Sequence, residues 1–431
     1  MRGLAFGALG LALAACVASN DERHGREGGE LQPEARTAAL PALNIDVMDT
    51  SVSGLSAGAY MAVQFHVAYA STLSGAAIFA GGPYDCAEGS LNTALTTCMT
   101  GSPAPPDPAR AVDATKRFAA AGSIDDPSNL ARQRVFLFGG ANDTTVVPPV
   151  MDALESYYRA WNPAALRYEK RHPGTGHTMP TLAYGGDCGT TAEPWIGKCN
   201  YDGAGIALAH IYGSLEPPAS SLSGRFVSLA QATYLSNPAS HSVADTGYAY
   251  IPASCEGGTQ CRVHVAFHGC KQYASGSVGD RFYKHAGYNE WADTNRIVVL
   301  YPQTIPTNGT NPNGCWDWWG YDSPNYATRA APQMAMVRRM IDAFAGGGGD
   351  AGDGGDAGNA GDGGAADAAR DSGTTCFVAN NYEHVTRGRA HVAWGYALAD
   401  GSNQNMGLYS VGVVTSLRQT GADSYVIGTC P

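Results

Sequence analysis

The sequence predicts an α/β fold in which helices cover a mostly parallel sheet, followed by a small β-rich module at the C-terminus. The chain has 431 residues, enough for one large domain and an accessory module. Short apolar runs alternate with helical patterns from residue 41 to residue 345, as expected for a sheet with covered faces. A Gly/Asp/Ala-rich segment, residues 346–375, then ends this pattern.

The N-terminus, MRGLAFGALGLALAAC, has the composition of a secretory signal peptide over residues 1–16. One arginine precedes a run of apolar and small residues that is too short to span a bilayer permanently. Leu13-Ala14-Ala15-Cys16 also resembles a bacterial lipoprotein signal, in which cleavage leaves a lipidated Cys16 that tethers the protein to a membrane. The alternative is an ordinary signal peptide that contains a cysteine. Residues 17–40 are polar and aperiodic, so we expect a disordered tether there.

The cysteine spacing predicts a disulfide-bonded, exported protein. Removing Cys16 from the 11 cysteines leaves ten, an even number. Five bridges require an oxidising compartment, and each would contribute about 2–4 kcal/mol, chiefly by restricting the unfolded chain. The expected pairs are Cys86/Cys98, Cys188/Cys199, Cys255/Cys261, Cys270/Cys315 and Cys376/Cys430.

The elements of the main domain, residues 41–345, follow from these apolar runs and helical periodicities. The expected strands are Gly75–Phe79, Arg134–Phe138, Leu166–Lys170, Phe226–Leu229, Tyr248–Ile251, Val263–Phe267 and Ile297–Tyr301. The expected helices among them are Pro149–Trp161, Gly205–Tyr212, Phe282–Asn295 and Thr328–Phe344. This alternation favours a covered, mostly parallel sheet.

After the main domain, residues 346–375 form a linker, because Gly, Asp and Ala alone cannot build a core. A calcium-binding Gly/Asp repeat is the alternative, but its nine-residue spacing is not kept. Residues 376–431 then form a small aromatic-rich module, bracketed by Cys376 and Cys430. A single disulfide is a sensible constraint for a module of this size.

Charge and spacing argue against two classes of ligand. The formal charge of −11 argues against nucleic acid as a partner, although part of it comes from the aspartates of the linker. The sequence has no C-x-x-C pair and no His/Cys cluster, which argues against a metal site.

A nucleophile motif stands near the start of the main domain. Gly54-Leu55-Ser56-Ala57-Gly58 is a G-x-S-x-G segment between an apolar stretch, Ile45 to Val52, and an alanine-rich helical stretch, Ala57 to Ala70. In a strand–turn–helix of this kind the serine occupies a strained corner and exposes its hydroxyl. The helix N-terminus directs partial positive charge to the place where an oxyanion would form. A simple Gly/Ser turn is the alternative.

Two further residues follow strand-like runs and can complete a catalytic triad. Asp143 comes after a run that ends in Gly139-Gly140, and His177 lies in Gly-Thr-Gly-His-Thr. The order Ser, Asp, His is that of α/β-hydrolases. Ser56 would attack an acyl carbon, His177 would transfer the proton, and Asp143 would orient the imidazole. Asp143 as a turn former and His172 as the base are the alternatives.

The oxyanion loop suggests a rearranged chain. One donor would be the N–H of Ala57, and α/β-hydrolases take the second from a loop that precedes the nucleophile. Here the suitable segment, His268-Gly269-Cys270 after the strand Arg262–Phe267, comes after His177. The chain is therefore expected to be a circularly permuted α/β-hydrolase, which is tolerable when termini lie close together at the surface. A plain disulfide loop at Cys270 is the alternative.

With these motifs in place, the chain resembles extracellular poly(3-hydroxybutyrate) depolymerases of the circularly permuted type. The matching segments, in order from about residue 50 to 345, are SGLSAGAYMAVQ, IFAGGPYDCA, ANDTTV, GTGHTMPT, CNYDGAGIAL, HIYGSL, HVAFHGCKQ, GYNEWADTN, VVLYPQ and NPNGCWDWWGY. The resemblance implies the triad Ser56, Asp143 and His177, and the N–H groups of Ala57 and Cys270 as oxyanion hole. It implies no metal or organic cofactor. Ala57 replaces a serine common in the family, which leaves the backbone donor unchanged.

The resemblance also implies a substrate and a mode of action. We expect a monomeric, secreted serine esterase that cuts a solid or oligomeric polyester through an acyl-enzyme. Trp318, Trp319 and Tyr321 are the expected substrate-binding side chains, although alternate residues of an extended run face opposite ways. The C-terminal module would bind the polymer. A feruloyl or acetyl carbohydrate esterase and a non-catalytic surface adhesin are the alternatives.

Overall fold

The computed structural model describes residues 40–346 and, near the C-terminus, residues 376–387, 389–393, 396–402, 404–408, 414–421 and 424–428. The chain divides into two compact units, Met1–Gly352 and Asp353–Pro431. Three expected segments lie outside the described residues: the signal peptide, nearly all of the tether and nearly all of the linker.

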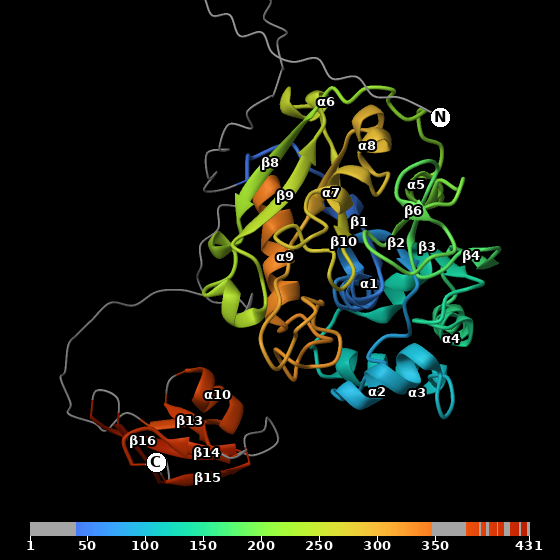
Figure 1. The fold of residues 1–431 in the computed structure, drawn as a ribbon. Coiled ribbons are helices and arrows are strands. Elements are labelled where there is room, and N and C mark those ends of the chain that lie inside the picture. Colours follow the sequence, from blue (N-terminus) through green and yellow to red (C-terminus); the bar gives the residue numbers. More distant parts are fainter. Residues whose placement is uncertain are drawn as a thin grey trace, which may run out of the picture. The chain divides into compact units, whose positions relative to one another are not determined.

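An eight-stranded sheet forms the centre of the first unit (Figure 1). In spatial order its strands are β4 (Ala165–His172), β3 (Arg134–Gly140), β2 (Leu73–Phe79), β1 (Thr50–Leu55), β10 (Arg262–Phe267), β11 (Ile297–Tyr301), β9 (Thr246–Ile251) and β8 (Arg225–Ala230). Neighbours from β4 to β11 pair in parallel, whereas β9 pairs antiparallel with both β11 and β8. The expected mostly parallel sheet is therefore present.

Helices pack on both faces of this sheet. One face carries α1 (Ala57–Ala68), α4 (Pro148–Arg159) and α9 (Pro332–Phe344), and the other carries α5 (Gly203–Tyr212), α7 (Arg281–His285) and α8 (Asn289–Asn295). The remaining elements lie in the connections: α2 (Leu91–Leu95), α3 (Pro108–Ala120), α6 (Ala253–Glu256), and a small sheet of β5 (Met179–Thr181), β7 (Ile196–Lys198) and β6 (Gly186–Asp187).

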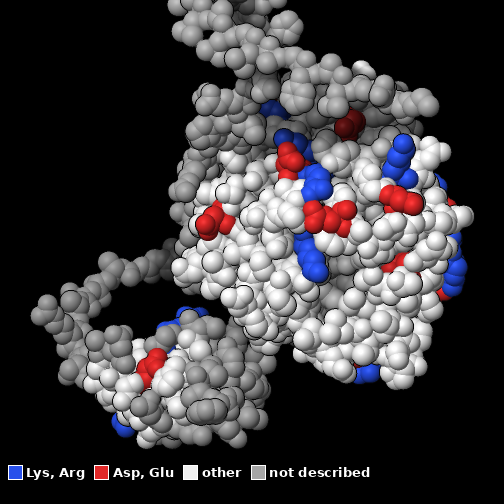
Figure 2. Space-filling view, viewed as in Figure 1, with Lys and Arg blue, Asp and Glu red and all other residues white. Residues whose placement is uncertain are grey.

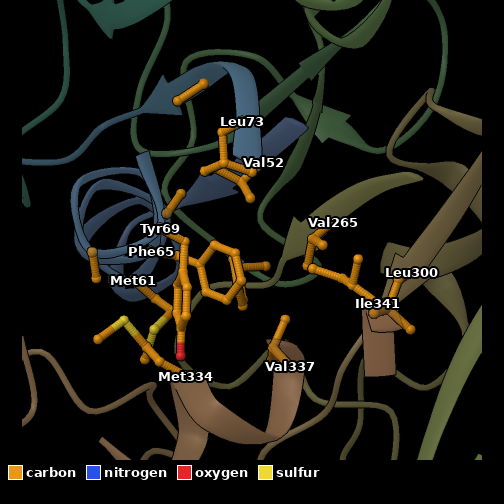
Figure 3. Close-up of a cluster of buried hydrophobic side chains, with 14 of the residues drawn as sticks. Val52, Met61, Phe65, Tyr69, Leu73, Val265, Leu300, Met334, Val337 and Ile341 are labelled. Carbon is orange, nitrogen blue, oxygen red and sulfur yellow. The ribbon is translucent and has the colours of Figure 1, made fainter. Parts of the chain in front are cut away.

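The two faces have separate cores because successive strand residues point to opposite sides. In β11, Val298 and Leu300 join one core, whereas Val299 and Tyr301 join the other. Figure 3 shows the first core, where side chains of α1 and α9 meet those of β1, β10 and β11. Full burial of an aliphatic or aromatic side chain there contributes roughly 1.5–3 kcal/mol. This packing fixes α1, and with it the turn between β1 and α1.

Several elements differ from the sequence-based expectation, and two of them have a clear local cause. The helix expected over Phe282–Asn295 is interrupted, because Gly287 has a φ of +92° and the side-chain Nδ2 of Asn289 donates to the carbonyl of Tyr283 at 2.8 Å. α3 was not expected, although its start signal is present: Pro108 is its first residue, and the Asp107 carboxylate accepts from the N–H of Ala109 at 2.9 Å.

The second unit is a small β-rich module, as expected. One sheet pairs β12 (Cys376–Asn380) with β16 (Val414–Gly421) and β16 with β17 (Ser424–Ile427); the other contains β13 (Ala390–Ala393), β14 (Tyr396–Ala399) and β15 (Asn405–Leu408). Its helix is α10 (Asn381–Thr386). Leu417 and Tyr425 are buried between these elements, whereas Val378 and Val414 are more than half exposed, at 63% and 65%.

The charged side chains of the first unit are mixed on the face drawn in Figure 2. Blue and red residues lie beside one another there, and most of the described surface on that face is uncharged. No helix in the described part of the chain is long and apolar enough to cross a membrane.

A buried histidine joins the two central strands. Ser51 and Ser53 of β1 contact Nδ1 and Nε2 of His264 on β10, at 2.6 and 2.7 Å. Burial lowers the pKa of His264 to about 3. Burial likewise lowers the pKa of His66 to about 3 and that of His268 to about 4. All three are therefore neutral in the folded protein at pH 5–7.

These three histidines predict that acid destabilises the fold. An unfolded histidine titrates near about 6.5, so between about pH 4 and 6.5 the unfolded chain binds more protons than the folded one. The free energy of unfolding should then fall as pH falls, by about 1.4 kcal/mol per pH unit for each histidine. Urea unfolding between pH 7.5 and 4.5 measures the slope. His66→Gln should reduce that slope by about 1.4 kcal/mol per pH unit, the contribution of one histidine. An unchanged slope would contradict the lowered pKa of His66.

Candidate active site

Ser56 occupies a tight turn between β1 and α1. Its φ of 58° and ψ of −123° are strained for a residue with a side chain. The turn exists because backbones approach each other without intervening side chains. A Cβ on Gly54 would lie 2.1 Å from the carbonyl oxygen of Gly58, and a Cβ on Gly58 would lie 2.3 Å from that of Phe267. The expected strand–turn–helix is therefore present, with Ser56 at its corner.

Asp143 and His177 meet beyond the carboxyl ends of β3 and β4. Asp143 Oδ2 lies 2.8 Å from His177 Nδ1, and both side chains are buried. Asp143 Oδ1 accepts from the N–H groups of Thr145 and Val146 at 2.8 and 2.9 Å, which fixes the carboxylate. Since a carboxylate only accepts hydrogen bonds, Nδ1 carries the proton and Nε2 is the basic nitrogen.

The alternative base, His172, lies elsewhere. Its Nδ1 contacts Thr175 Oγ1 at 2.7 Å, and its ring packs against Phe138 and Tyr201. It is not among the residues that line the cavity at Ser56.

The segment after β10 lies against the serine. A Cβ on Gly269 would stand 3.4 Å from the Cβ of Ser56. Two side chains hold this segment. His268 Nδ1–H donates to the Gly269 carbonyl at 2.7 Å while its Nε2 accepts from the N–H of Thr304 at 3.2 Å, and Gln272 Oε1 accepts from the N–H of Gly269 at 2.7 Å. The loop expected to supply an oxyanion donor is thus next to Ser56 and held in place.

One cavity of about 420 Å³ joins these parts. Ser56, His177 and Cys270 all line it. Ala57 is the first residue of α1, so its N–H lies at the helix N-terminus beside the serine. The apolar wall of the cavity consists of Leu91, Leu95, Met99, Trp195, Trp318 and Trp319. The cavity can therefore hold an apolar acyl chain with an ester group at the serine.

The tryptophan segment divides between core and cavity. Trp316 is fully buried against Phe267 and His268, whereas Trp318 and Trp319 line the cavity. Trp318 stacks on Tyr60 of α1, with ring centroids 4.0 Å apart and an interplanar angle of 14°. Its indole Nε1 is buried and has no hydrogen-bond partner among the described residues.

Tyr321 does not line the cavity, contrary to its expected role. Its hydroxyl is used inside the protein: it donates to the Cys315 carbonyl at 2.8 Å and lies 2.9 Å from Gln333 Nε2. Tyr321 was expected to bind substrate because it stands beside the tryptophans in the sequence. The turn after Trp319 directs its ring into the protein instead.

Three residues of the apolar wall were not expected from the sequence: Leu91, Leu95 and Met99. They lie on α2 and the turn after it, and Cys86–Cys98 closes this segment onto itself. Leu91 and Leu95 are about half exposed, at 50% and 51%. Two leucines four residues apart on a short exposed helix were the available signal.

Four of the five expected cysteine pairs are disulfide-bonded in the structure: Cys86–Cys98, Cys188–Cys199, Cys255–Cys261 and Cys270–Cys315. Cys376 is also disulfide-bonded, and Cys430 lies outside the described residues. Within those residues no group of three or more His, Cys, Asp or Glu side chains could hold a metal ion.

Comparison with known proteins gives the family. A poly(3-hydroxybutyrate) depolymerase of Delftia acidovorans is 40% identical, over 91% of this chain and 94% of the relative. A polyhydroxybutyrate depolymerase of Talaromyces funiculosus is 41% identical, over 73% of this chain and 95% of the relative. The chain is a member of the poly(3-hydroxybutyrate) depolymerase family. No family model matches it.

The fold agrees with solved structures of depolymerases. The crystal structure of PHB depolymerase from Penicillium funiculosum matches with a TM-score of 0.66 and 40% identity, over 72% of this chain and 99% of that chain. A serine-to-alanine variant of PHB depolymerase, complexed with an R3HB trimer, matches equally well. The α/β-hydrolase class expected from the sequence is thus confirmed for this depolymerase.

The close backbone contact at Gly58 predicts a sensitive position. Gly58→Ala would push α1 away from the end of β10, because the added Cβ would lie 2.3 and 2.5 Å from the carbonyl oxygens of Phe267 and His268. We expect turnover of a soluble ester to fall at least about tenfold and the free energy of unfolding to fall by about 1–3 kcal/mol. Gly186→Ala, where a Cβ meets nothing within 4 Å, is the matched control. Equal activity of the two variants would contradict the prediction.

Proposed function

We propose that this chain is a serine esterase that hydrolyses the ester bonds of poly(3-hydroxybutyrate) or related polyhydroxyalkanoates. One observation carries the proposal: Ser56 and His177 line the same apolar cavity, and Asp143 holds His177 Nδ1 at 2.8 Å. The family supports the substrate, because the relatives are named for poly(3-hydroxybutyrate) and a related structure contains an R3HB trimer.

The proposed reaction follows from the roles of these groups. Ser56 Oγ attacks the ester carbonyl carbon while His177 Nε2 takes its proton, and the N–H groups of Ala57 and Cys270 stabilise the oxyanion. His177 then gives the proton to the leaving alkoxide oxygen as the ester C–O bond breaks, which releases an alcohol and leaves an acyl group on Ser56. Water, activated by the same histidine, releases the acid and restores the serine. No step of this reaction requires a metal or organic cofactor.

The tryptophan wall is the proposed binding surface for the polyester. Trp318 and Trp319 offer apolar ring surface to the methyl-bearing chain, and Trp318 is held in place by stacking on Tyr60 of α1. Apolar contact of this kind adds affinity, whereas the position of the ester group would be set by the backbone donors beside Ser56.

We also infer a circular permutation of the hydrolase order. The strand order supports it: β10 lies next to β1 and in parallel with it, although it follows His177 in the chain. The register pairs Gly54 with Phe267, which brings the nucleophile turn and the oxyanion loop to the same sheet edge.

The proposed organisation begins with export. Residues 1–16 act as a signal peptide, residues 17–40 as a tether, and Cys16 as the lipid attachment site that keeps the monomeric enzyme at the outer cell surface. The disulfides fit an oxidising compartment. Residues 346–375 link the catalytic unit, residues 41–345, to the C-terminal module.

The module, residues 376–431, is proposed to adsorb to the polymer. Val378 and Val414 support this role, since both are exposed and lie diagonally on one face of the β12–β16 pair, where Val378 pairs with Ser416. A bound module would raise the effective concentration of the catalytic unit at the solid. A protein- or cell-wall-binding module is the alternative.

Ser56→Ala tests the nucleophile. We expect turnover of both a p-nitrophenyl ester and a poly(3-hydroxybutyrate) suspension to fall by roughly 10⁴–10⁶-fold, because the acyl-enzyme can no longer form. Labelling by a fluorophosphonate probe should disappear while circular dichroism stays unchanged. Near-normal esterase activity of Ser56→Ala would refute the triad. If the wild-type enzyme cleaves a plant cell wall ester but not the polyester, a carbohydrate esterase is favoured instead.

Truncation after residue 345 tests the module. Hydrolysis of a soluble p-nitrophenyl ester should be unchanged, because all residues that line the cavity at Ser56 belong to the first compact unit. Adsorption to polymer granules and their erosion should decrease at least about tenfold. A pull-down with granules measures adsorption. Equal binding by full-length and truncated protein would remove the polymer-binding role.

A further inference from the structure

A single carboxylate organises the turn that follows the tryptophans. Asp317 stands between Trp316 and Trp318, and its side chain is buried. Its Oδ1 accepts from the N–H groups of Gly320 and Tyr321 at 2.8 and 2.9 Å. Its Oδ2 accepts from those of Asp322 and Ser323 at 3.2 and 3.1 Å. Four consecutive backbone donors thus converge on one side chain.

The backbone of the same residue is tied to two helices. The N–H of Asp317 donates to Gln333 Oε1 of α9 at 2.9 Å, and its carbonyl accepts from Gln64 Nε2 of α1 at 3.0 Å. Asp317 is therefore fixed to α1 and α9, two of the helices that pack on one face of the sheet. From this fixed point Trp316 enters the core, whereas Trp318 and Trp319 enter the cavity.

We propose that Asp317 is the positioning residue of the substrate-binding wall: its carboxylate folds the turn from residue 317 to residue 323 and thereby holds Trp318 and Trp319 against the bound polyester. The inference rests on the function proposed for the cavity. Asp317 does not line the cavity and acts only through the tryptophans.

The unfavourable burial of the Asp317 carboxylate indicates that its role is to shape the turn rather than to stabilise the fold. Burial, together with the nearby charge of Asp322, raises the pKa of Asp317 to about 7, so the charged form is unfavourable there. The four N–H groups offset part of that cost. A buried charge is a weak source of stability compared with apolar packing, which suggests that the shape of the turn is what the charge secures.

The chemistry at Ser56 is held by other contacts. The oxyanion segment is fixed by Gln272, by His268 and by the Cys270–Cys315 disulfide, none of which bonds to the Asp317 carboxylate. Loss of that carboxylate should therefore impair binding of a substrate that extends along the tryptophans more than cleavage of a short ester.

The test compares two substrates in three variants of the full chain. Asp317→Ala removes all four acceptor contacts, and Asp317→Asn keeps one acceptor oxygen in the same shape. Asp293→Asn is the matched control, since Asp293 also accepts from two backbone N–H groups, those of Ser223 and Gly224, away from the cavity. Steady-state kinetics are measured with the R-3-hydroxybutyrate trimer and with p-nitrophenyl acetate.

We expect Asp317→Ala to raise KM for the trimer at least about tenfold while kcat/KM for p-nitrophenyl acetate stays within about threefold of wild type. Asp317→Asn should lie between Asp317→Ala and wild type, and should decide the question if Asp317→Ala does not fold. Asp293→Asn should change the kinetic constants for both substrates equally or leave both unchanged.

A parallel loss with both substrates, or an unchanged KM for the trimer, would overturn the positioning role. The same split in Asp293→Asn would also overturn it, because the effect would then be a general loss of stability. If wild-type enzyme cleaves p-nitrophenyl acetate but not the trimer, the proposed function itself fails, and the inference fails with it.

Discussion

The structure depends on one close approach of backbones, where the first turn of α1 touches the end of β10. No side chain fits between Gly58 and the carbonyl oxygens of Phe267 and His268. This contact places two segments that are far apart in the sequence beside Ser56. One begins α1, and the other is the loop after β10, which is proposed to supply an oxyanion donor. The buried contacts of His264 with Ser51 and Ser53 hold the same two strands together below the site.

The second requirement is rigidity in the loops that carry the chemistry. Electrostatic stabilisation of an oxyanion is effective when the donors need no rearrangement during the reaction. Here the loop after β10 is held by a neutral histidine, whose two ring nitrogens have different roles: one donates to Gly269 and the other accepts from Thr304. Protonation of His268 would remove that acceptor, and burial opposes it by lowering the pKa to about 4. The low pKa thus preserves the loop geometry.

The parts of the site predicted from the sequence are those encoded next to a strand end. Ser56, Asp143 and His177 each follow an apolar run by a few residues, so local pattern placed them at one sheet edge. The interruption of the helix at Gly287 and the inward direction of Tyr321 depend on tertiary contacts, which periodicity does not report. The apolar wall formed by Leu91 and Leu95 was missed for the same reason, since an exposed leucine becomes informative only when the cavity beside it is known.

The contrast between two tryptophans bears on specificity. Both Trp316 and Trp318 have a buried indole N–H without a partner among the described residues, but only Trp318 lines the cavity. Leaving such a donor unpaired costs about 1–3 kcal/mol. Because the Nε1 atom of Trp318 is itself buried, the surface that this side chain offers to the cavity is apolar. The wall therefore contributes apolar contact, and the polar groups of the cavity lie among its other lining residues, such as Thr191, Lys271 and Gln272.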